Sequence, residues 1–255
     1  MGMYRLTQSS LKDLEREESC PSRWKAEWID GLREQLTSPP VIKGNYFESI
    51  VIGENAKGEV DWMKKYPWIF FKKNGGKRAD IKRIEEQAWR AKKMFDPKHP
   101  TFIGWEIISV QDKLKVNSTP VDEEGTLDII ATDGFENAII DLKLTSDVTS
   151  TRTKWSWGNY KILDYFQQEH YQWLYENNVK DLPRMFMFVM DYSVRMGFKF
   201  FEVNVDDEDR DYYLYRKSKF KEAFRHYKTN GWSTFPSKKE CEECPINANC
   251  KDVIF

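Results

Sequence analysis

Two segments decide the fold of this 255-residue chain: GTLDIIAT at Gly125–Thr132 and NAIIDLKLT at Asn137–Thr145. Both are rich in strand-forming apolar residues, and the Asp133-Gly134 pair between them favours a tight hairpin turn. We therefore expect two antiparallel strands. The second is so apolar that we expect it at the centre of a sheet.

Each of these strands carries charge among apolar neighbours. Asp141 and Lys143 are two residues apart, so they face the same side of the sheet, and the hairpin brings Asp128 alongside. Two carboxylates in an apolar setting repel each other unless a positive charge lies between them, and Mg²⁺ is typically held by one or two carboxylates. Lys143 would then act on a phosphate oxygen or an attacking water. A surface ion pair between Asp141 and Lys143 remains an equally good explanation of these residues alone.

Apolar periodicity extends the pattern on both sides of the hairpin. Further strands are expected at Phe102–Val110, Lys113–Asn117, Met185–Asp191 and Gly197–Val205, and helices at Gly44–Gly53, Ala79–Phe95, Trp155–Tyr175 and Asp209–Lys228. The sum predicts an α/β (α+β) fold with a mixed central sheet of about five to six strands flanked by helices. No linker is long enough to divide the chain, so a single domain over residues 1–255 is expected.

The cysteines gather near the two ends of the chain. Cys20 is followed only by a C-x2-C-x5-C cluster formed by Cys241, Cys244 and Cys250. Four thiolates complete a tetrahedral zinc site or an iron–sulfur cluster, and spacing does not choose between them. Either group would join the N- and C-terminal segments.

Composition excludes several classes of protein. The chain is 40% hydrophobic and 32% charged with a net charge of −1, which argues against a disordered tail and a generic polyanion binder. Its apolar runs are too short to span a membrane, and MGMYRLTQSS lacks the core of a secretory signal. We expect a cytoplasmic protein of a bacterial, archaeal or phage-infected cell. The sequence contains no ATP-binding Walker motif.

The order of these motifs resembles the PD-(D/E)XK nuclease superfamily. The matching residues are Glu48 in GNYFESIVIG, Asp128 in GTLD, Asp141 to Lys143 in DLK, and Gln167 with Tyr171 in QQEHY. The cysteines are similar to those of the RecB-like iron–sulfur branch, which includes the AddB nuclease domain and exonucleases of CRISPR adaptation and phages. The resemblance implies a restriction-endonuclease-like core at about 41–205 and a DNA exonuclease of end processing, recombination or CRISPR-like adaptation.

The resemblance also implies a metal site. Asp128 and Asp141 would bind Mg²⁺ or Mn²⁺, with the Leu142 carbonyl as a third ligand and Glu48 reaching the same metal directly or through water. Several iron–sulfur relatives carry His at the position of Glu48, and Leu127 stands where the family name places Pro. The first departure puts the exact branch and the number of metals in question, whereas that Pro is often missing in this branch.

Further roles follow from the same likeness. Lys143 would stabilise the transition state or position the attacking water. Gln167 and Tyr171, one helical turn apart, would contact DNA or order the site, and a shifted alignment of the same helix would use Gln168 and Gln172 instead.

The implied cofactors and partners complete the expectation. Cys20, Cys241, Cys244 and Cys250 would hold a structural [4Fe–4S] cluster, with Zn²⁺ as the alternative. Single- or double-stranded DNA ends would be the substrate, with stacking and phosphate contacts from Arg152, Lys154, Trp155 and Trp157. A helicase or recombination protein would be the partner. A structure-specific endonuclease and a catalytically inactive iron–sulfur DNA-binding module remain the alternatives.

Overall fold

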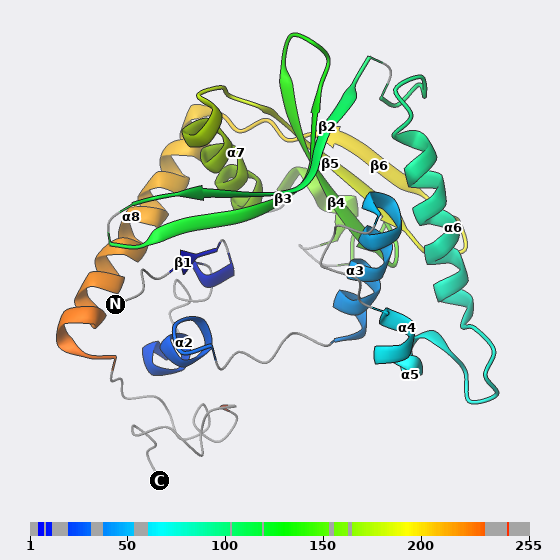
Figure 1. Ribbon diagram of the computed structural model, residues 1–255, viewed down its shortest axis with the longest axis horizontal. Coiled ribbons are helices and arrows are strands. Elements are labelled where there is room, and N and C mark those ends of the chain that lie inside the picture. Colours follow the sequence, from blue (N-terminus) through cyan, green and yellow to red (C-terminus); the bar gives the residue numbers. More distant parts are fainter. Residues whose placement is uncertain are drawn as a thin grey trace. The chain divides into compact units, whose positions relative to one another are not determined.

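The computed structural model describes residues 5–7, 9–11, 20–31, 38–53, 61–102, 104–118, 120–152, 156–162, 165–232 and 244 (Figure 1). The chain forms two compact units. Unit 1 comprises Met1–Gln35, Lys115–Gly125 and Val205–Phe255, and unit 2 comprises Leu36–Leu114 and Thr126–Asn204. Among the described helices, none is both long and apolar enough to cross a membrane.

The described residues form a mixed sheet of six strands, five of which lie wholly or mostly in unit 2. These five are β2 (Glu106–Val116), β3 (Asp122–Thr132), β4 (Asn137–Thr145), β5 (Arg184–Asp191) and β6 (Phe198–Glu202). Their order is β3-β4-β5-β6, and β2 pairs with β3. The β3–β4 and β5–β6 pairs are antiparallel and the β4–β5 pair is parallel, so the predicted mixed sheet is confirmed.

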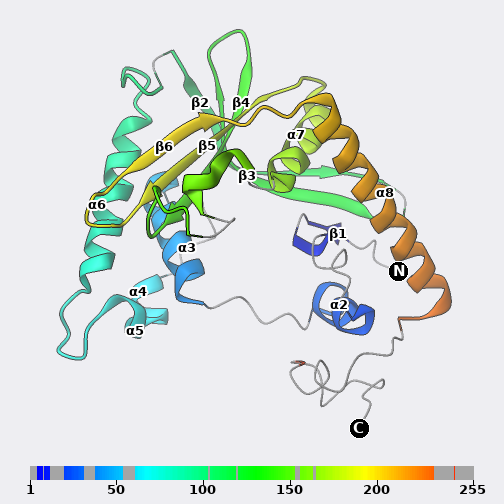
Figure 2. The ribbon, with the colours of Figure 1, turned by 180° about the vertical axis from the view of Figure 1, so that it is seen from behind.

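Helices cover both faces of this sheet in unit 2. On one face, α3 (Pro39–Ile52) and α6 (Ala79–Met94) pack over a core that includes Ile129, Ile140 and Phe188. The opposite face carries Asp141 and Met187, and α7 (Phe166–Val179) contacts both through Gln168. Figures 1 and 2 show α3 and α6 on one side of the strands and α7 on the other. Three short helices, α4 (Trp62–Lys65), α5 (Pro67–Phe70) and η1 (Trp157–Ile162), complete the unit.

The three largest differences from the expected element boundaries are in α3, β2 and α7. Helix α3 begins at Pro39 rather than near Gly44, because proline is compatible with the first helical turn, where its missing N–H is not needed. The two strands expected around residue 111 form one strand, β2, and Phe102 instead packs in the core against Phe95. The helix expected from Trp155 begins only at Phe166, after the 3₁₀ segment η1.

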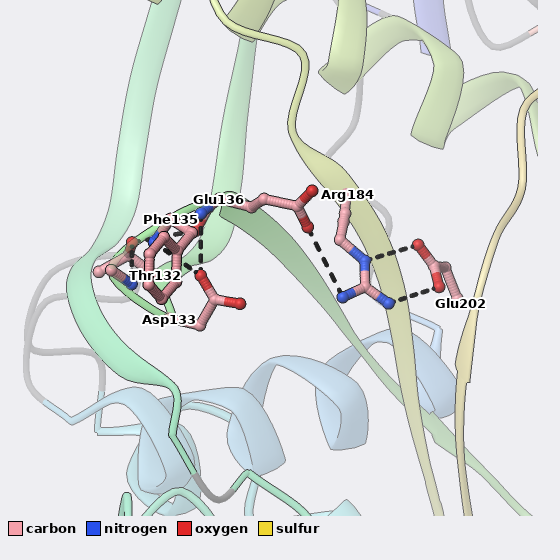
Figure 3. A network of polar contacts seen from close by, with 7 residues as sticks. Thr132, Asp133, Phe135, Glu136, Arg184 and Glu202 are labelled. Atoms are coloured by element: carbon pink, nitrogen blue, oxygen red, sulfur yellow. Dashed lines mark hydrogen bonds and ion pairs between the residues drawn. The ribbon is translucent and has the colours of Figure 1, made fainter.

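The turn between β3 and β4 is tightly hydrogen-bonded, as Asp133-Gly134 predicted. Asp133 Oδ1 accepts hydrogen bonds from the backbone N–H groups of Phe135 (2.9 Å) and Glu136 (2.8 Å), and Gly134 supplies the positive φ of 92°. Figure 3 shows this turn beside Arg184, whose guanidinium makes two bonds to Glu202 at 2.7 and 2.8 Å. This end of the hairpin is therefore held by matched donors and acceptors.

Unit 1 contains β1 (Arg5–Leu6), α2 (Pro21–Trp28) and α8 (Asp207–Asn230), and the first residues of β3 pair in parallel with β1. Helix α8 is anchored by a buried ion pair: Glu123 is fully buried and lies 2.7 Å from Lys217 Nζ and 2.8 Å from Lys221 Nζ. Trp24 of α2 packs against Phe220 and Phe224 of α8. These contacts bring segments from both ends of the chain into one unit.

Candidate active site

Two aspartates lie opposite each other on the central strands of unit 2. Ile129 of β3 pairs with Ile140 of β4, so the next step along the register places Asp128 opposite Asp141. Asp128 Oδ2 accepts a hydrogen bond of 2.8 Å from the backbone N–H of Leu142. The Asp141 side chain is buried, with 1% of its surface exposed.

Asp141 has one satisfied oxygen and one unsatisfied oxygen. Its Oδ2 accepts from Lys143 Nζ at 2.6 Å and from Gln168 Nε2 at 3.0 Å. Its Oδ1 is buried and has no hydrogen-bond partner among the described residues. A buried carboxylate oxygen without a donor is costly, so its presence points to a group that is bound during function.

Glu48 and Gln111 complete the cluster from two other elements. Glu48 lies on α3, one turn before the end of the helix, and Gln111 lies in the middle of β2. Gln111 Nε2 donates to Glu48 Oε1 at 3.0 Å and to Asp128 Oδ1 at 3.3 Å. The site therefore draws on a helix and three strands, all within unit 2.

Burial and mutual repulsion set the protonation of the cluster. Burial raises the pKa of Asp128 to about 8, and the charges of Asp141 and Glu48 add to the effect. Burial alone would lower the pKa of Lys143, but the Asp141 and Asp128 carboxylates outweigh it and raise that pKa above its ordinary value. Burial, with Asp141 and Asp128, likewise raises the pKa of Tyr171. At neutral pH, Lys143 is a cation and Tyr171 is a neutral hydrogen-bond donor.

Helix α7 places both alignments of its predicted motif near the site. Gln168 contacts Asp141 directly, whereas Gln167 donates to the hydroxyl of Tyr171 at 2.8 Å. Gln172 instead donates to the Pro183 carbonyl at 2.9 Å, away from the carboxylates. Gln168 is therefore the residue of this helix that contacts the cluster, and Gln167 is paired with Tyr171.

A divalent cation fits the chemistry of this cluster. Within the described residues, no group of three or more His, Cys, Asp or Glu side chains that could hold a metal ion is found, so a cation is inferred from the chemistry of the individual carboxylates. The Gln111 amide lies within hydrogen-bonding distance of both Glu48 and Asp128, and the unpaired Oδ1 of Asp141 belongs to the aspartate opposite Asp128. Carboxylate oxygens of this kind are the ligands that Mg²⁺ and Mn²⁺ prefer.

Two sets of predicted residues remain, namely the four cysteines and the four residues expected to contact DNA. Cys20, the N-cap residue of α2, and Cys244 are both half-buried, whereas Cys241 and Cys250 lie outside the described residues. The structure therefore describes half of the predicted cluster ligands.

The four residues predicted to contact DNA divide in the same way. Arg152 is exposed and Trp157 is half-buried at the start of η1, while Lys154 and Trp155 lie outside the described residues. The Trp157 carbonyl accepts a hydrogen bond of 2.8 Å from Lys199 Nζ.

Gln111 is the site residue that the sequence patterns missed. It falls in the gap left between the two strands expected around residue 111, and no family motif includes it. The only signal in the sequence was an uncharged amide between Val110 and Asp112, in a segment where apolar and polar residues otherwise alternate. This pattern is too common to assign a functional role to Gln111.

Comparisons with known proteins concern the family and the fold of the chain. The sequence model of the PD-(D/E)XK nuclease superfamily matches residues 6–251. Among solved structures, a presumed exonuclease from Eubacterium rectale superposes with a TM-score of 0.68 at 17% identity, covering 99% of this chain and 90% of that chain. The protein SSO0001 gives a TM-score of 0.40 at 11% identity, covering 100% of this chain and 89% of that one. No curated protein sequence matches.

Proposed function

Because the chain belongs to the PD-(D/E)XK nuclease superfamily, we propose that it is a Mg²⁺- or Mn²⁺-dependent deoxyribonuclease that acts as an exonuclease. The observation that carries the proposal is the cluster of Asp128, Asp141 and Lys143, in which Asp141 Oδ1 is buried without a hydrogen-bond partner among the described residues. An inactive binding module would not need to keep this unsatisfied oxygen. The proposed fold is a restriction-endonuclease-like core, in keeping with the Eubacterium rectale structure.

The proposed metal ligands are the carboxylates of Glu48, Asp128 and Asp141 and the carbonyl oxygen of Leu142. When bound, the cation would activate a water molecule and neutralise charge that develops on the scissile phosphate. Asp141 would be held in place by its bonds to Lys143 and Gln168, so its Oδ1 is oriented before the metal arrives.

Lys143 acts in this proposal as a fixed cation. Its raised pKa keeps the ammonium group protonated at neutral pH, so it stabilises negative charge and does not remove a proton. Tyr171 also keeps its proton, and since its oxygen accepts from Gln167, its own O–H remains available to donate toward the substrate. Both groups would face the phosphate from the α7 side of the sheet.

A second group is proposed for unit 1, where Cys20, Cys241, Cys244 and Cys250 would hold a [4Fe–4S] cluster. The described part of this set is Cys20, the N-cap residue of α2, and Cys244, and both are half-buried. Zn²⁺ is the alternative. Anaerobic purification followed by iron, sulfide and zinc analysis distinguishes the two, because only the cluster carries inorganic sulfide and visible absorbance.

The proposed substrate is a single- or double-stranded DNA end. The enzyme would act in recombination, end processing or CRISPR-like adaptation, together with a helicase or recombination protein. Its proposed location is the cytoplasm of a bacterial, archaeal or phage-infected cell. Exposed Arg152 and half-buried Trp157, with Lys154 and Trp155, would contact the strand. We propose that the two units together form one nuclease domain over residues 1–255.

The test is cleavage of end-labelled linear DNA, single- and double-stranded, beside a covalently closed circle, with Mg²⁺ or Mn²⁺. Degradation of linear DNA alone, abolished in Asp141→Ala, is expected, and the label reveals the polarity. Cutting of the circle would replace the exonuclease with an endonuclease. DNA binding without metal-dependent cleavage would leave the inactive module.

A further inference from the structure

We propose that Gln111 is a positioning residue, which orients the Glu48 and Asp128 carboxylates so that they bind a divalent cation together. The inference rests on the proposed function and assigns a role to a residue outside the family motifs. It predicts that the metal affinity of the site depends on the Gln111 amide as well as on the ligands themselves.

The contacts of Gln111 carry the first step. Its Nε2 atom has two N–H groups, and it lies 3.0 Å from Glu48 Oε1 and 3.3 Å from Asp128 Oδ1. One amide therefore joins a carboxylate on α3 to a carboxylate on β3. Glu48 is the member of the cluster that comes from a helix, so this link ties its flexible side chain to the sheet.

The chemistry of the side chain carries the second step. The carboxylates of Glu48 and Asp128 carry like charges and both lie within hydrogen-bonding distance of the same Gln111 Nε2 atom, so they repel each other when both are ionised. A lysine at residue 111 would neutralise this repulsion, but its charge would also repel the metal. A neutral amide donates to both carboxylates and leaves their negative charge available to the cation.

The backbone carries the third step. Gln111 has a φ of 55° in the interior of β2, a conformation that non-glycine residues rarely adopt. The other described non-glycine residues with positive φ, Lys180 and Met196, lie at the C-terminus of α7 and in the β5–β6 turn. Strain inside a strand persists only where the surroundings maintain it, and such sites are concentrated in functional centres.

The strained segment is also clamped beside Gln111. The Ser109 hydroxyl donates to Asp112 Oδ2 at 2.6 Å, which links the residues on either side of the kink. The kink therefore has a defined geometry, and its result is to aim one amide at two acids. Outer-sphere partners that orient metal ligands are worth about 10–100-fold in metal affinity.

The test compares Mn²⁺ binding by isothermal titration calorimetry for the wild type, Gln111→Met, Gln111→Gly and Gln172→Met, using the full chain. Methionine keeps the side-chain volume and the backbone strain but removes the donors. Glycine removes the donors and relieves the strain. Gln172→Met is the matched control, because Gln172 loses a hydrogen bond to the Pro183 carbonyl, away from the carboxylates.

We expect both Gln111 variants to bind Mn²⁺ about 10-fold or more weakly than the wild type, with Gln172→Met unchanged. Thermal unfolding should rank Gln111→Gly above Gln111→Met, because only glycine accepts the positive φ without strain. Adding Gln111→Met to Glu48→Gln should then weaken binding less than it does in the wild type, since one of the two carboxylates that Gln111 orients is already gone.

Equal or tighter binding by Gln111→Met overturns the inference, and so does equal weakening by Gln172→Met. The proposed function stands in both cases as long as the wild type binds metal and cleaves DNA. A wild type that binds no divalent cation overturns the proposed function and this inference together.

Discussion

Near the hairpin turn between β3 and β4, the carboxylates of Asp133 and Glu202 accept well-formed hydrogen bonds. Farther along β3 and β4, acidic side chains are instead crowded together. The Asp133 carboxylate accepts backbone N–H bonds from Glu136 and Phe135, which lower its pKa. The pKa of Glu202 is lowered by its hydrogen bonds to Arg184. Asp128, by contrast, has its pKa raised by burial and by its neighbours Asp141 and Glu48.

The difference shows which part of the hairpin serves stability and which part serves chemistry. Acids with lowered pKa values stabilise the folded state at neutral pH, and acids with raised pKa values destabilise it. Acids with raised pKa values are typical of functional sites, where a bound ligand or substrate offsets their unfavourable free energy. The comparison therefore predicts opposite responses when acids at the two ends are neutralised.

The largest response is expected for Asp128→Asn. Because the pKa of Asp128 is raised to about 8, its ionisation favours the unfolded chain. The wild type without metal should lose stability as pH rises from about 4, where the unfolded carboxyl ionises, to about 8, where the folded one does. Above that range, Asp128→Asn should be more stable than the wild type by on the order of 3 kcal/mol, although DNA cleavage is lost.

The measurement is urea denaturation in EDTA at pH values on either side of this range. Asp133→Asn is the matched control, since it neutralises an acid at the hairpin end of the same strand. Its pKa is lowered, so the variant should be less stable than the wild type at neutral pH and should converge with it in acid. If both variants shifted stability in the same direction, the contrast between the two ends would be wrong.

The next response is expected for Lys143→Met. This change leaves the buried Asp141 carboxylate without its cation, so it should destabilise the fold by about 2 kcal/mol, with the partial exposure of Lys143 limiting the effect. Cleavage should fall by about 100-fold or more, because the charge that faces the phosphate is gone. Single-turnover cleavage with saturating Mn²⁺ and a denaturation curve measure both effects. A neutral Lys143 acting as a base would instead make wild-type activity rise with pH through the lysine pKa.

The acidic cluster on β3 and β4 was easier to predict from the sequence than the contacts that surround it. Asp128, Asp141 and Lys143 stand out because charges in apolar strands need a reason, and the hairpin turn at Asp133-Gly134 fixes their register. Gln111 was hidden because its role depends on a backbone kink inside β2, and a positive φ at a glutamine has no signature in the sequence.

The same limit applies to helix phase. Gln167, Gln168 and Gln172 are chemically alike, and only the start of α7 at Phe166 decides that Gln168 points at Asp141. Helix α3 began earlier than expected because Pro39 and Pro40 can end one segment or open the first turn of the next. Long-range packing decides both the phase of α7 and the start of α3, and local sequence patterns carry no information about that packing.

A smaller response is expected at the satisfied end, for Arg184→Met. Arg184 makes a two-bond ion pair with Glu202 and lies over the Phe186 ring at 4.9 Å. Methionine keeps most of the ring contact and removes the pair, so stability should fall by about 1 kcal/mol, less at high salt. Metal binding and cleavage should match the wild type. A large loss of either would mean that the two ends of the hairpin are coupled.

The smallest response is expected for Phe135→Ser at the tip of the hairpin. Phe135 is 97% exposed, and its backbone is held by Asp133 rather than by its side chain. The unfolding free energy should therefore change by less than about 0.5 kcal/mol. Gly134→Ala offers the contrast one residue away, because a φ of 92° is strained for any residue with a Cβ, and about 1 kcal/mol should be lost there. Parallel urea denaturation of the two variants measures this difference. If Phe135→Ser were the more damaging change, the turn would depend on its aromatic side chain, and its stability could no longer be attributed to hydrogen bonds alone.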